Sequence, residues 1–183
     1  MKIERIVYPV ITLGPDKRIG IWTIGCPHNC PMCINPELQV LNSTKEINVI
    51  KLSEILIKES IKNNCHSITF TGVDPMYQRE ELLQLLEIIR PYFDDILVYT
   101  GYEYSELEKE DIKNIDVLID GKYIDELNEK DLPLRGSSNQ NVIFINRKLI
   151  DKYDSFMVKG RPIQNMIIND ELISIGIHNR LEE

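Results

Sequence analysis

Short apolar runs of strand length alternate with amphipathic stretches of helix length along this chain. This alternation constrains the fold more than any other feature of the sequence. Strands are predicted at Ile3–Thr12, Arg18–Ile24, Ser67–Phe70, Ile96–Tyr99, Val117–Ile119 and Val142–Ile145. Helices are predicted at Ser53–Asn63, with Ser53 as the N-cap, at Glu80–Ile89, ended by Pro91, and at Ser105–Lys113. Strands that alternate with helices in this order predict an α/β fold with parallel pairing and right-handed crossovers.

The length of the chain limits how far such a sheet can close. A closed eight-stranded α/β barrel needs about 250 residues, or about 200 at its smallest, whereas this chain has 183. We therefore expect an incomplete parallel β/α barrel or an open sheet. No repeat or linker divides the chain, so residues 1–183 are predicted to form one domain, with residues 159–183 as a C-terminal extension. The extension has the pattern of a hairpin, and the sequence does not indicate where it packs.

Composition and charge exclude several other classes of protein. The content of 43% hydrophobic and 27% charged residues argues against a disordered or collagen-like chain. No apolar run is long enough to span a membrane, and the first residues lack the apolar stretch of a signal peptide, so we expect a cytoplasmic protein with no membrane partner. A net charge of −8 repels phosphate backbones, which disfavours nucleic acid as a partner.

Glycine and polar residues follow four of the predicted strands. Gly25 and a group of cysteines come after Ile24, and the segments TGVDP, YTGY and DGKY follow the next three buried strands. Each segment alone is weak evidence, because Gly and Asp are ordinary turn residues. In parallel α/β folds, however, the loops at the carboxyl ends of the strands open on one face, where ligands bind. The four segments are therefore predicted to converge on a single site.

The first of these loops, GCPHNCPMC, carries three of the four cysteines, Cys26, Cys30 and Cys33, within eight residues. Three cysteines cannot all pair with one another as disulfides, and in a reducing compartment such a group indicates metal binding. An iron–sulfur cluster with four irons, held by three thiolates, would leave one iron open for a substrate or cofactor. Zinc is the alternative, with His28, Cys65 or His66 as a fourth ligand. His28 is badly placed for that role, because it lies between two of the thiolates.

The same loop and the segments after it resemble a known family. The string GCPHNCPMCINPE resembles the cluster loop of the radical S-adenosylmethionine (SAM) enzymes, and CINPE is close to its continuation in glycyl-radical-enzyme activases. TGVDP, YTGY, IDVLIDGKYIDEL and LRGSSNQ resemble later segments of the activases, in the same order. The resemblance covers about Tyr8 to Val142, and DGKY with RGSSNQ points to the activase branch. IDVLIDGKYIDEL followed by LRGSSNQ resembles the activases of anaerobic ribonucleotide reductases.

This resemblance implies a fold, a reaction and partners. The fold would be a partial parallel β/α barrel of the radical SAM type. Cys26, Cys30 and Cys33 would be the catalytic and metal-ligating residues and hold a 4Fe-4S cluster, whose open iron binds SAM. One electron, from reduced flavodoxin or ferredoxin, would cleave SAM to methionine and a 5′-deoxyadenosyl radical. The radical would generate a glycyl radical on a partner enzyme, and an anaerobic ribonucleoside-triphosphate reductase is the expected partner.

The resemblance also implies which residues contact SAM. Residues flanking the last cysteine would lie beside SAM, and Gly72 to Asp74 would hold the ammonium group of SAM. Thr100 and Gly101 would lie near its ribose. Asp120 would hold a cation or the ribose side, and Lys122 would face the carboxylate of SAM. The full set is Met32, Cys33, Ile34, Asn35, Gly72, Val73, Asp74, Thr100, Asp120, Lys122, Ser137 and Asn139. Two positions depart from the family pattern: Met32 replaces an aromatic residue or glycine, and Val73 replaces a second glycine.

Two alternatives to an activase remain open at this point. The same radical chemistry can act on a peptide or a small molecule, because short enzymes of this kind resemble the activases in sequence. The cysteines can also belong to a zinc or iron–sulfur binding module without catalysis. Cys65 itself is expected to be a buried apolar thiol at the start of a strand.

Overall fold

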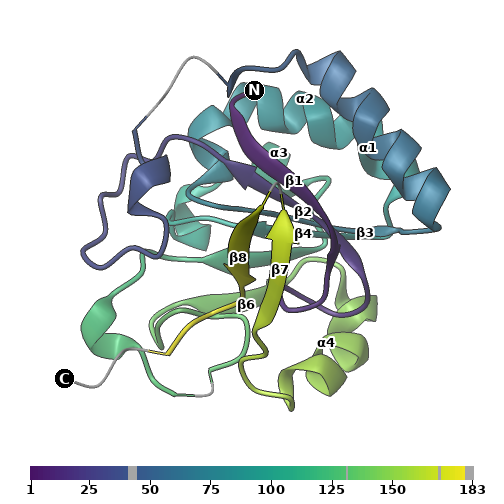
Figure 1. Cartoon of the computed structure of the whole chain (residues 1–183). Coiled ribbons are helices and arrows are strands. Elements are labelled where there is room, and N and C mark those ends of the chain that lie inside the picture. Colours follow the sequence, from purple (N-terminus) through teal and green to yellow (C-terminus); the bar gives the residue numbers. More distant parts are fainter. Residues whose placement is uncertain (41–44, 131, 169, 180–183) are drawn as a thin grey trace.

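The computed structural model describes residues 1–40, 45–130, 132–168 and 170–179. These residues form a six-stranded sheet covered on both faces, with a separate two-stranded hairpin (Figure 1). The strand order in the sheet follows the chain and is β1-β2-β3-β4-β5-β6. The strands are β1 (Ile3–Val10), β2 (Arg18–Thr23), β3 (Ser67–Thr71), β4 (Asp95–Tyr99), β5 (Val117–Asp120) and β6 (Asn141–Phe144).

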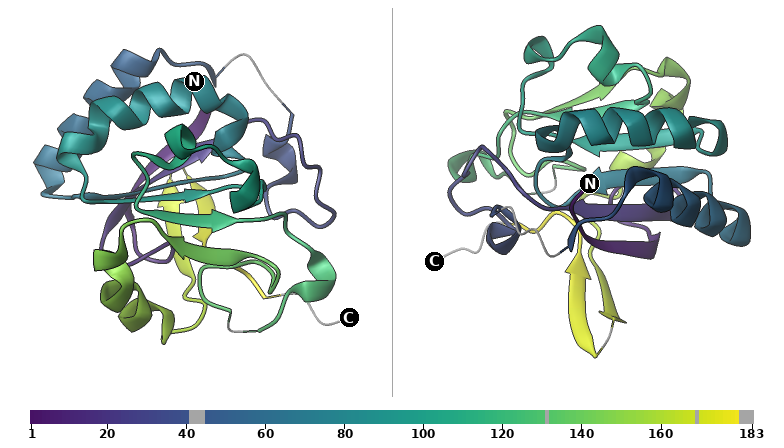
Figure 2. Two further views of the ribbon diagram at one scale, coloured as in Figure 1. Left: turned by 180° about the vertical axis from the view of Figure 1, so that it is seen from behind. Right: turned by 90° about the horizontal axis from the view of Figure 1, so that it is seen from above.

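Helices cover the sheet on two sides. The helices are α1 (Val49–Asn63), α2 (Arg79–Ile89), α3 (Lys109–Ile112) and α4 (Ile150–Met157). Figure 2 shows α1 and α2 side by side on one face, while α4 and the hairpin lie on the other. The α/β fold class predicted from the sequence is confirmed as a mixed sheet with mostly parallel strands.

Pairing is parallel from β2 through β5 and antiparallel at both edges. Strand β1 runs antiparallel to β2, and β6 runs antiparallel to β5. The expectation of parallel pairing throughout was therefore wrong for the first and last strands. Parallel neighbours need a crossover connection, and the short connection from β1 to β2, residues 11–17, contains no helix that would make one.

Side chains of the central strands alternate between two separate cores. In β4, Ile96 and Val98 join the core beneath α1 and α2. Leu97, between them, packs on the opposite face with Tyr153 and Phe156 of α4. This two-residue period is expected of a strand that is buried on both faces.

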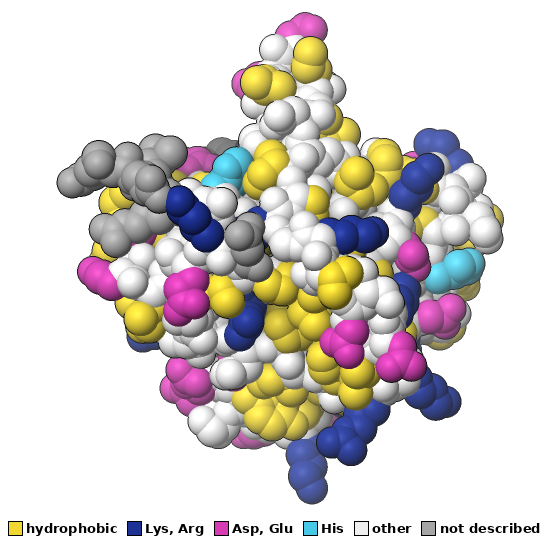
Figure 3. Space-filling view, turned by 90° about the horizontal axis from the view of Figure 1, so that it is seen from below, with side chains coloured by type: hydrophobic (Ala, Val, Ile, Leu, Met, Phe, Trp, Pro, Cys, Tyr) yellow, Lys and Arg dark blue, Asp and Glu magenta, His cyan; other side chains and the backbone are white. Residues whose placement is uncertain are grey.

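The C-terminal extension forms the hairpin that its sequence pattern predicted. Strands β7 (Gln164–Ile168) and β8 (Glu171–Ile175) pair with each other and not with the main sheet. Buried Ile175 joins the core formed by β1 and β2, which includes Trp22. The hairpin projects from the body of the molecule (Figure 3), and the paired Ile167 and Leu172 are both 74% exposed.

Arg161 connects the extension to the loop that precedes β6. Its guanidinium donates hydrogen bonds to the carbonyl oxygens of Leu132 at 2.9 Å and of Arg135 at 2.8 Å. It also bonds the side-chain oxygen of Asn128 at 2.6 Å. The extension thus holds the backbone that leads into the serine-rich segment 135–140.

Two helix predictions need correction, and one helix was missed. Helix α1 begins at Val49, because Asn48 caps it by accepting hydrogen bonds from two backbone N–H groups, whereas Ser53 lies inside the helix. The helix predicted at 105–113 is replaced by a 3-10 turn, Tyr104–Glu106, and the single turn of α3, since Glu103 and Glu108 each form a capping box that starts a new element. Helix α4 was not predicted from the sequence.

A buried ion pair joins the amino ends of the central strands. The guanidinium of Arg18 in β2 contacts both oxygens of Asp95 in β4, at 2.9 and 3.0 Å, and both side chains are almost completely buried. Arg18 also donates to Thr69 of β3 at 2.7 Å, and Tyr153 of α4 donates to Asp95 at 2.7 Å. One bidentate pair therefore connects three strands and a helix.

None of the helices in the described part of the chain combines the length and the apolar character that crossing a bilayer requires.

Replacing Asp95 by Asn removes the counter-charge of Arg18 and leaves its guanidinium buried. We expect Asp95→Asn to lower the free energy of unfolding at neutral pH by about 3–5 kcal/mol, measured by urea denaturation. Glu4→Gln is the control, because the Glu4–Lys45 pair is partly exposed and its loss should cost less than about 1 kcal/mol.

The same pair makes stability depend on acidity. Burial raises the pKa of the Asp95 carboxyl. The charge of Arg18 and the hydrogen bonds that Asp95 accepts outweigh burial and leave this pKa below its ordinary value of 3.8. The stabilisation is therefore complete above pH 3.8 and is lost as the pH falls through the lower folded value. The stability difference between wild type and Asp95→Asn should shrink in acid, and a difference independent of pH would contradict this assignment.

Candidate functional site

The cysteine loop leaves β2 at the carboxyl end of the parallel strands. Two backbone hydrogen bonds close the loop on itself, from Gly25 to Leu38 at 2.8 Å and from Cys26 to Gln39 at 3.1 Å. Asn29 and Met32 adopt left-handed backbone conformations, with φ of 48° and 55°, and turn the chain between successive cysteines. Cys26, Cys30 and Cys33 are half-buried free thiols.

The pKa values of two of the thiols, Cys26 and Cys30, reflect the surroundings of the loop. Burial raises the pKa of the Cys26 thiol, and the nearby charges of Asp74 and Cys30 raise it further. Backbone N–H groups of His28 and Asn29 that bond the sulfur act in the opposite direction. The Cys26 thiol is therefore protonated at neutral pH in the apo protein and must release its proton when it binds metal.

Cys30 brings a distant loop to the site. Burial raises the pKa of the Cys30 thiol, the backbone N–H of Tyr123 and the charge of Lys122 lower it, and the neighbouring Cys33 raises it. Tyr123 and Lys122 belong to the DGKY segment after β5. The cysteine loop therefore extends from its own strand, β2, to the loop after β5.

The carboxylate of Asp74 connects three segments of the site. Asp74 follows β3, is 1% exposed, and accepts hydrogen bonds from the backbone N–H of Met76 at 2.9 Å and of Gly101 at 3.0 Å. The hydroxyl of Thr100 donates to it at 3.0 Å, and Nε2 of His28 lies 2.5 Å from its Oδ2. One buried acid thus joins the cysteine loop to the loops after β3 and β4.

His28 is enclosed by the loop after β4. Its ring lies 4.7 Å from that of Tyr102 in an edge-to-face arrangement at 76°. Gly101 makes room for the ring, because a Cβ at this position would lie 2.3 Å from Cδ2 of His28. Only 6% of the His28 side chain is exposed.

A second contact ties the end of the cysteine loop to β3. Asn35 donates a hydrogen bond from its side-chain amide to the carbonyl of Gly72 at 2.6 Å. Gly72 has a φ of +97°, and a Cβ there would lie 2.9 Å from the backbone nitrogen of Thr23. A residue with a side chain would therefore be strained at this position, so the backbone of TGVDP lies close to the start of the cysteine loop.

Asp120 and the 135–140 loop each make hydrogen bonds that fix segments around the end of β5. Asp120 is buried, and its oxygens accept hydrogen bonds from Asn141 at 2.9 and 3.0 Å and from the backbone of Tyr104 at 2.9 Å. Ser137 accepts from the backbone of Ile124 at 3.2 Å. Asn139 donates to the carbonyl of Lys122 at 2.8 Å, while its own Oδ1 is buried without a partner.

The structure brings some of the predicted residues together and leaves others apart. Cys26, Asn35, Gly72, Asp74 and Thr100 are connected by the contacts described above. Met32 and Ile34 are instead 75% and 65% exposed. Val73 packs against the core that the hairpin covers.

The other residues considered as zinc ligands lie elsewhere. Cys65 is 3% exposed, as expected for a structural thiol, and donates to the carbonyl of Lys17 at 3.2 Å. It and His66 precede β3 and so lie at the opposite end of the parallel strands from the cysteine loop. Within the described ranges, no three His, Cys, Asp or Glu side chains are grouped to hold a single metal ion.

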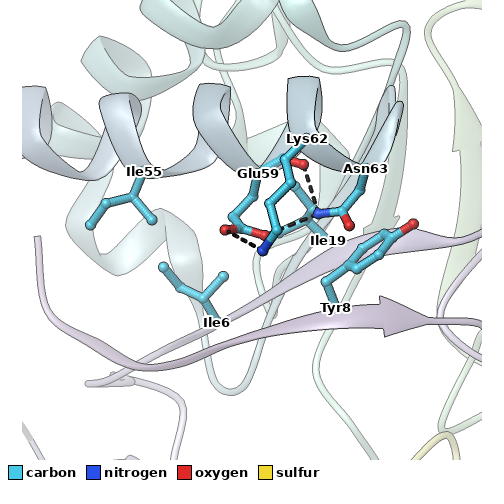
Figure 4. A pocket seen from close by; sticks show the side chains of 7 residues that line it. All are labelled: Ile6, Tyr8, Ile19, Ile55, Glu59, Lys62 and Asn63. Atoms are coloured by element: carbon cyan, nitrogen blue, oxygen red, sulfur yellow. Dashed lines mark hydrogen bonds and ion pairs between the residues drawn. The ribbon is translucent and has the colours of Figure 1, made fainter.

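A shallow hollow of about 470 Å³ lies between α1 and the strands β1 and β2 (Figure 4). Its walls combine the apolar Ile6, Ile19 and Ile55 with Glu59 and Lys62, which pair with each other at 3.5 Å. No cysteine and none of the residues around Asp74 contribute to it. The hollow is therefore separate from the candidate site.

The residues of the loop fit an iron–sulfur cluster by the chemistry of their donors. Three free thiols are half-buried within one turn-rich loop, and each of Cys26 and Cys30 is bonded by backbone N–H groups, which stabilise thiolates. A cluster of four irons is wider than one ion, so its ligands need not meet the spacing of a mononuclear site.

Comparison with known proteins agrees with this chemistry. Residues 12–143 match the family described as a 4Fe-4S single cluster domain. The chain is 33% identical to the anaerobic ribonucleoside-triphosphate reductase-activating protein of Enterobacteria phage T4, over 78% of this chain and 93% of that protein. The protein of the same name from Escherichia coli K12 is also 33% identical, over 74% and 94%, and that from Vibrio cholerae is 32% identical, over 73% and 92%.

The chain belongs to this 4Fe-4S family of activating proteins. All three loop cysteines lie inside the matched range, whereas the hairpin β7–β8 lies outside it. The prediction of a 4Fe-4S protein of the activating-protein kind is confirmed.

Sequence reasoning missed several residues that form the site. His28 was considered only as a zinc ligand, and its bond to Asp74 was not expected. Tyr102 and Tyr123 were not singled out, although both belong to segments that were. The position of His28 between two cysteines was the available signal, since a polar aromatic residue fixed inside a ligand loop has neighbours to bind.

The raised pKa values of Cys26 and Cys30 predict how these thiols react with iodoacetamide. Because only the thiolate reacts, their alkylation in the apo protein should still accelerate as the pH passes the ordinary thiol pKa of 9.0. Mass spectrometry of each cysteine-containing peptide, in a Cys65→Ala background, measures this. A rate that levels off below pH 9.0 would show that burial does not control these thiols.

Proposed function

We propose that this protein is a radical SAM enzyme that activates a glycyl radical enzyme. The expected partner is an anaerobic ribonucleoside-triphosphate reductase, and reduced flavodoxin or ferredoxin is the expected electron donor. The proposal includes a partial β/α barrel of the radical SAM type, whose parallel part is β2 to β5.

One observation carries the proposal. Three half-buried free thiols lie on a loop that also contacts Asp74, at the end of the sheet where the four glycine-containing segments meet. Three ligands leave a position open on a four-iron cluster. The names of the relatives, which refer to the activation of an anaerobic reductase, support the choice of partner.

A bound 4Fe-4S cluster would supply the electron that cleaves SAM to methionine and a 5′-deoxyadenosyl radical, which removes a hydrogen atom from a glycine of the partner. The chain's own residues would hold the cluster and orient SAM. Cys26, Cys30 and Cys33 would bind iron, and the exposed neighbours of Cys33, Met32 and Ile34, would lie beside SAM.

Other residues would hold the two charged groups of SAM. The buried carboxylate of Asp74 attracts the ammonium, and the carbonyls of Gly72 and Val73 lie on the same segment. Lys122, which is exposed beside Cys30, would pair with the carboxylate of SAM. Asn35 and Asn139 supply amides, and the unpartnered Oδ1 of Asn139 can accept a hydrogen bond from the cofactor.

Asp120 and Ser137 act on the site through the backbone. Both are buried, and they hold the loops after β5 and before β6. Their contribution to SAM binding would therefore be the placement of Lys122 and Asn139. Thr100 similarly fixes Asp74 by a direct hydrogen bond.

A pair of cysteine variants tests the cluster. After anaerobic reconstitution, Cys30→Ala should lose bound iron and inorganic sulfide, and should produce no 5′-deoxyadenosine from SAM with dithionite, because one of three ligands is missing. Cys65→Ala is the matched control and should retain both, since Cys65 is buried outside the loop. Circular dichroism checks that both variants fold. A wild-type protein with one tightly bound Zn²⁺ and no sulfide would refute the proposal.

The partner assignment has a separate test. Reduced holoprotein, SAM and an anaerobic ribonucleoside-triphosphate reductase from the same source should give a glycyl radical signal in electron paramagnetic resonance. The signal should be absent when SAM is omitted. Production of 5′-deoxyadenosine without any glycyl radical would retain the radical chemistry and reject this partner in favour of a peptide or small-molecule substrate.

A further inference from the structure

His28 lies between the first two cysteines, yet the proposed function gives it no role. We infer that His28 is a positioning residue, which locks the Cys26–Cys30 turn onto Asp74 so that the thiols are in place before the cluster binds. This inference rests on the proposed function, because it concerns the loop that would hold the cluster.

The ring of His28 has a specific partner and little freedom. Nε2 donates a hydrogen bond to Oδ2 of Asp74 at 2.5 Å, and the ring packs edge-to-face on Tyr102 with centroids 4.7 Å apart. Asp74 is itself fixed by the backbone of Gly101 and by Thr100. The histidine, in the loop after β2, is therefore held by a fixed acceptor in the loop after β3.

The backbone of the same residue reaches the first ligand. The backbone N–H of His28 lies near the sulfur of Cys26 and lowers the pKa of that thiol. Fixing the ring on Asp74 thus also fixes the N–H that faces the thiol. A single residue connects the acid, the turn and the first ligand.

The turn itself needs an external support. Asn29, next to His28, has a left-handed φ of 48°, and Pro27 and Asn29 are both exposed. A turn with few buried contacts costs conformational entropy to order. If His28 already orders the turn in the apo protein, less conformational entropy is lost when metal binds. Residues that orient metal ligands in this way often change metal affinity by about 10–100-fold.

Gly101 shows how closely the ring is fitted. A Cβ at residue 101 would lie 2.3 Å from Cδ2 and 2.6 Å from Nε2 of His28. The backbone of Gly101 does not require glycine by a positive φ. The space taken by the His28 ring is therefore the reason that a side chain is not accommodated there.

The first test uses the apo protein and hydrogen exchange. We expect His28→Ala to speed exchange in peptides covering residues 26–35 by about tenfold or more, while the strand β4 keeps its protection. His28→Gln should restore much of the protection, because its amide can still donate to Asp74. His66→Gln is the control, since His66 is exposed at the other end of β3. Unchanged exchange in His28→Ala would overturn the inference.

The second test uses the reconstituted protein. Iron release to a chelator should be about tenfold faster in His28→Ala than in wild type, and the electron paramagnetic resonance spectrum of the reduced cluster should change. Gly101→Ala should reproduce these effects by displacing the ring. The double variant His28→Ala/Gly101→Ala should be no worse than His28→Ala alone, because the added methyl then has no ring to displace. Additive effects would show that Gly101 acts independently of His28.

The two tests separate this inference from the proposed function. A wild-type protein that takes up no iron and sulfide would reject the proposed function, whereas apo-protein exchange would still decide whether His28 fixes the turn. A wild-type protein that holds the cluster, with His28→Ala equal to it in exchange and in iron release, would reject the positioning role alone.

Discussion

The carboxylate of Asp74 receives hydrogen bonds from two loops that leave different strands. The donors from these loops are His28 of the cysteine loop and Thr100 and Gly101 after β4. A buried carboxylate is stable only when its oxygens are satisfied, and charge-assisted hydrogen bonds are the strong ones. The parallel order places β3 between β2 and β4, so the loop after β3 is the one position from which a short acid can reach both neighbours. The arrangement of the site depends on this one side chain.

The cysteine loop does not stay above its own strand. Cys26 lies near Asp74, after β3, whereas Cys30 lies near Tyr123 and Lys122, after β5. The loop therefore crosses the carboxyl ends of the parallel strands, and the thiols face segments that are far apart in the sequence. Because the loop crosses these strand ends, the glycine-containing segments, each weak as separate evidence, all lie around the same three thiols.

Sequence periodicity was sufficient for the parallel core but not for its edges. Apolar runs such as Ile96–Tyr99 predicted the central strands, because burial on both faces leaves a clear pattern. The direction of β1 and β6 depends on the connections, which periodicity does not describe. Helix α4 is short and half polar, and its place is decided by Tyr153, which packs against one face of the sheet and bonds Asp95. Likewise the three cysteines were evident from spacing, whereas the fit of His28 against Gly101 is a contact between distant segments and leaves no local signal.

Two buried acids at opposite ends of the parallel strands show how stability and chemistry are separated. The charge of Asp95 is balanced by its ion pairs with Arg18 and Lys152, and this acid therefore serves stability. In the part of the chain that the structure describes, Asp74 forms an ion pair with neither Lys nor Arg, and its donors are a hydroxyl, backbone N–H groups and His28. Hydroxyl and backbone N–H donors hold a carboxylate in place without supplying the full positive charge of a Lys or Arg. In the proposed function, the ammonium of SAM would be the cationic group that Asp74 meets beside the cysteine loop.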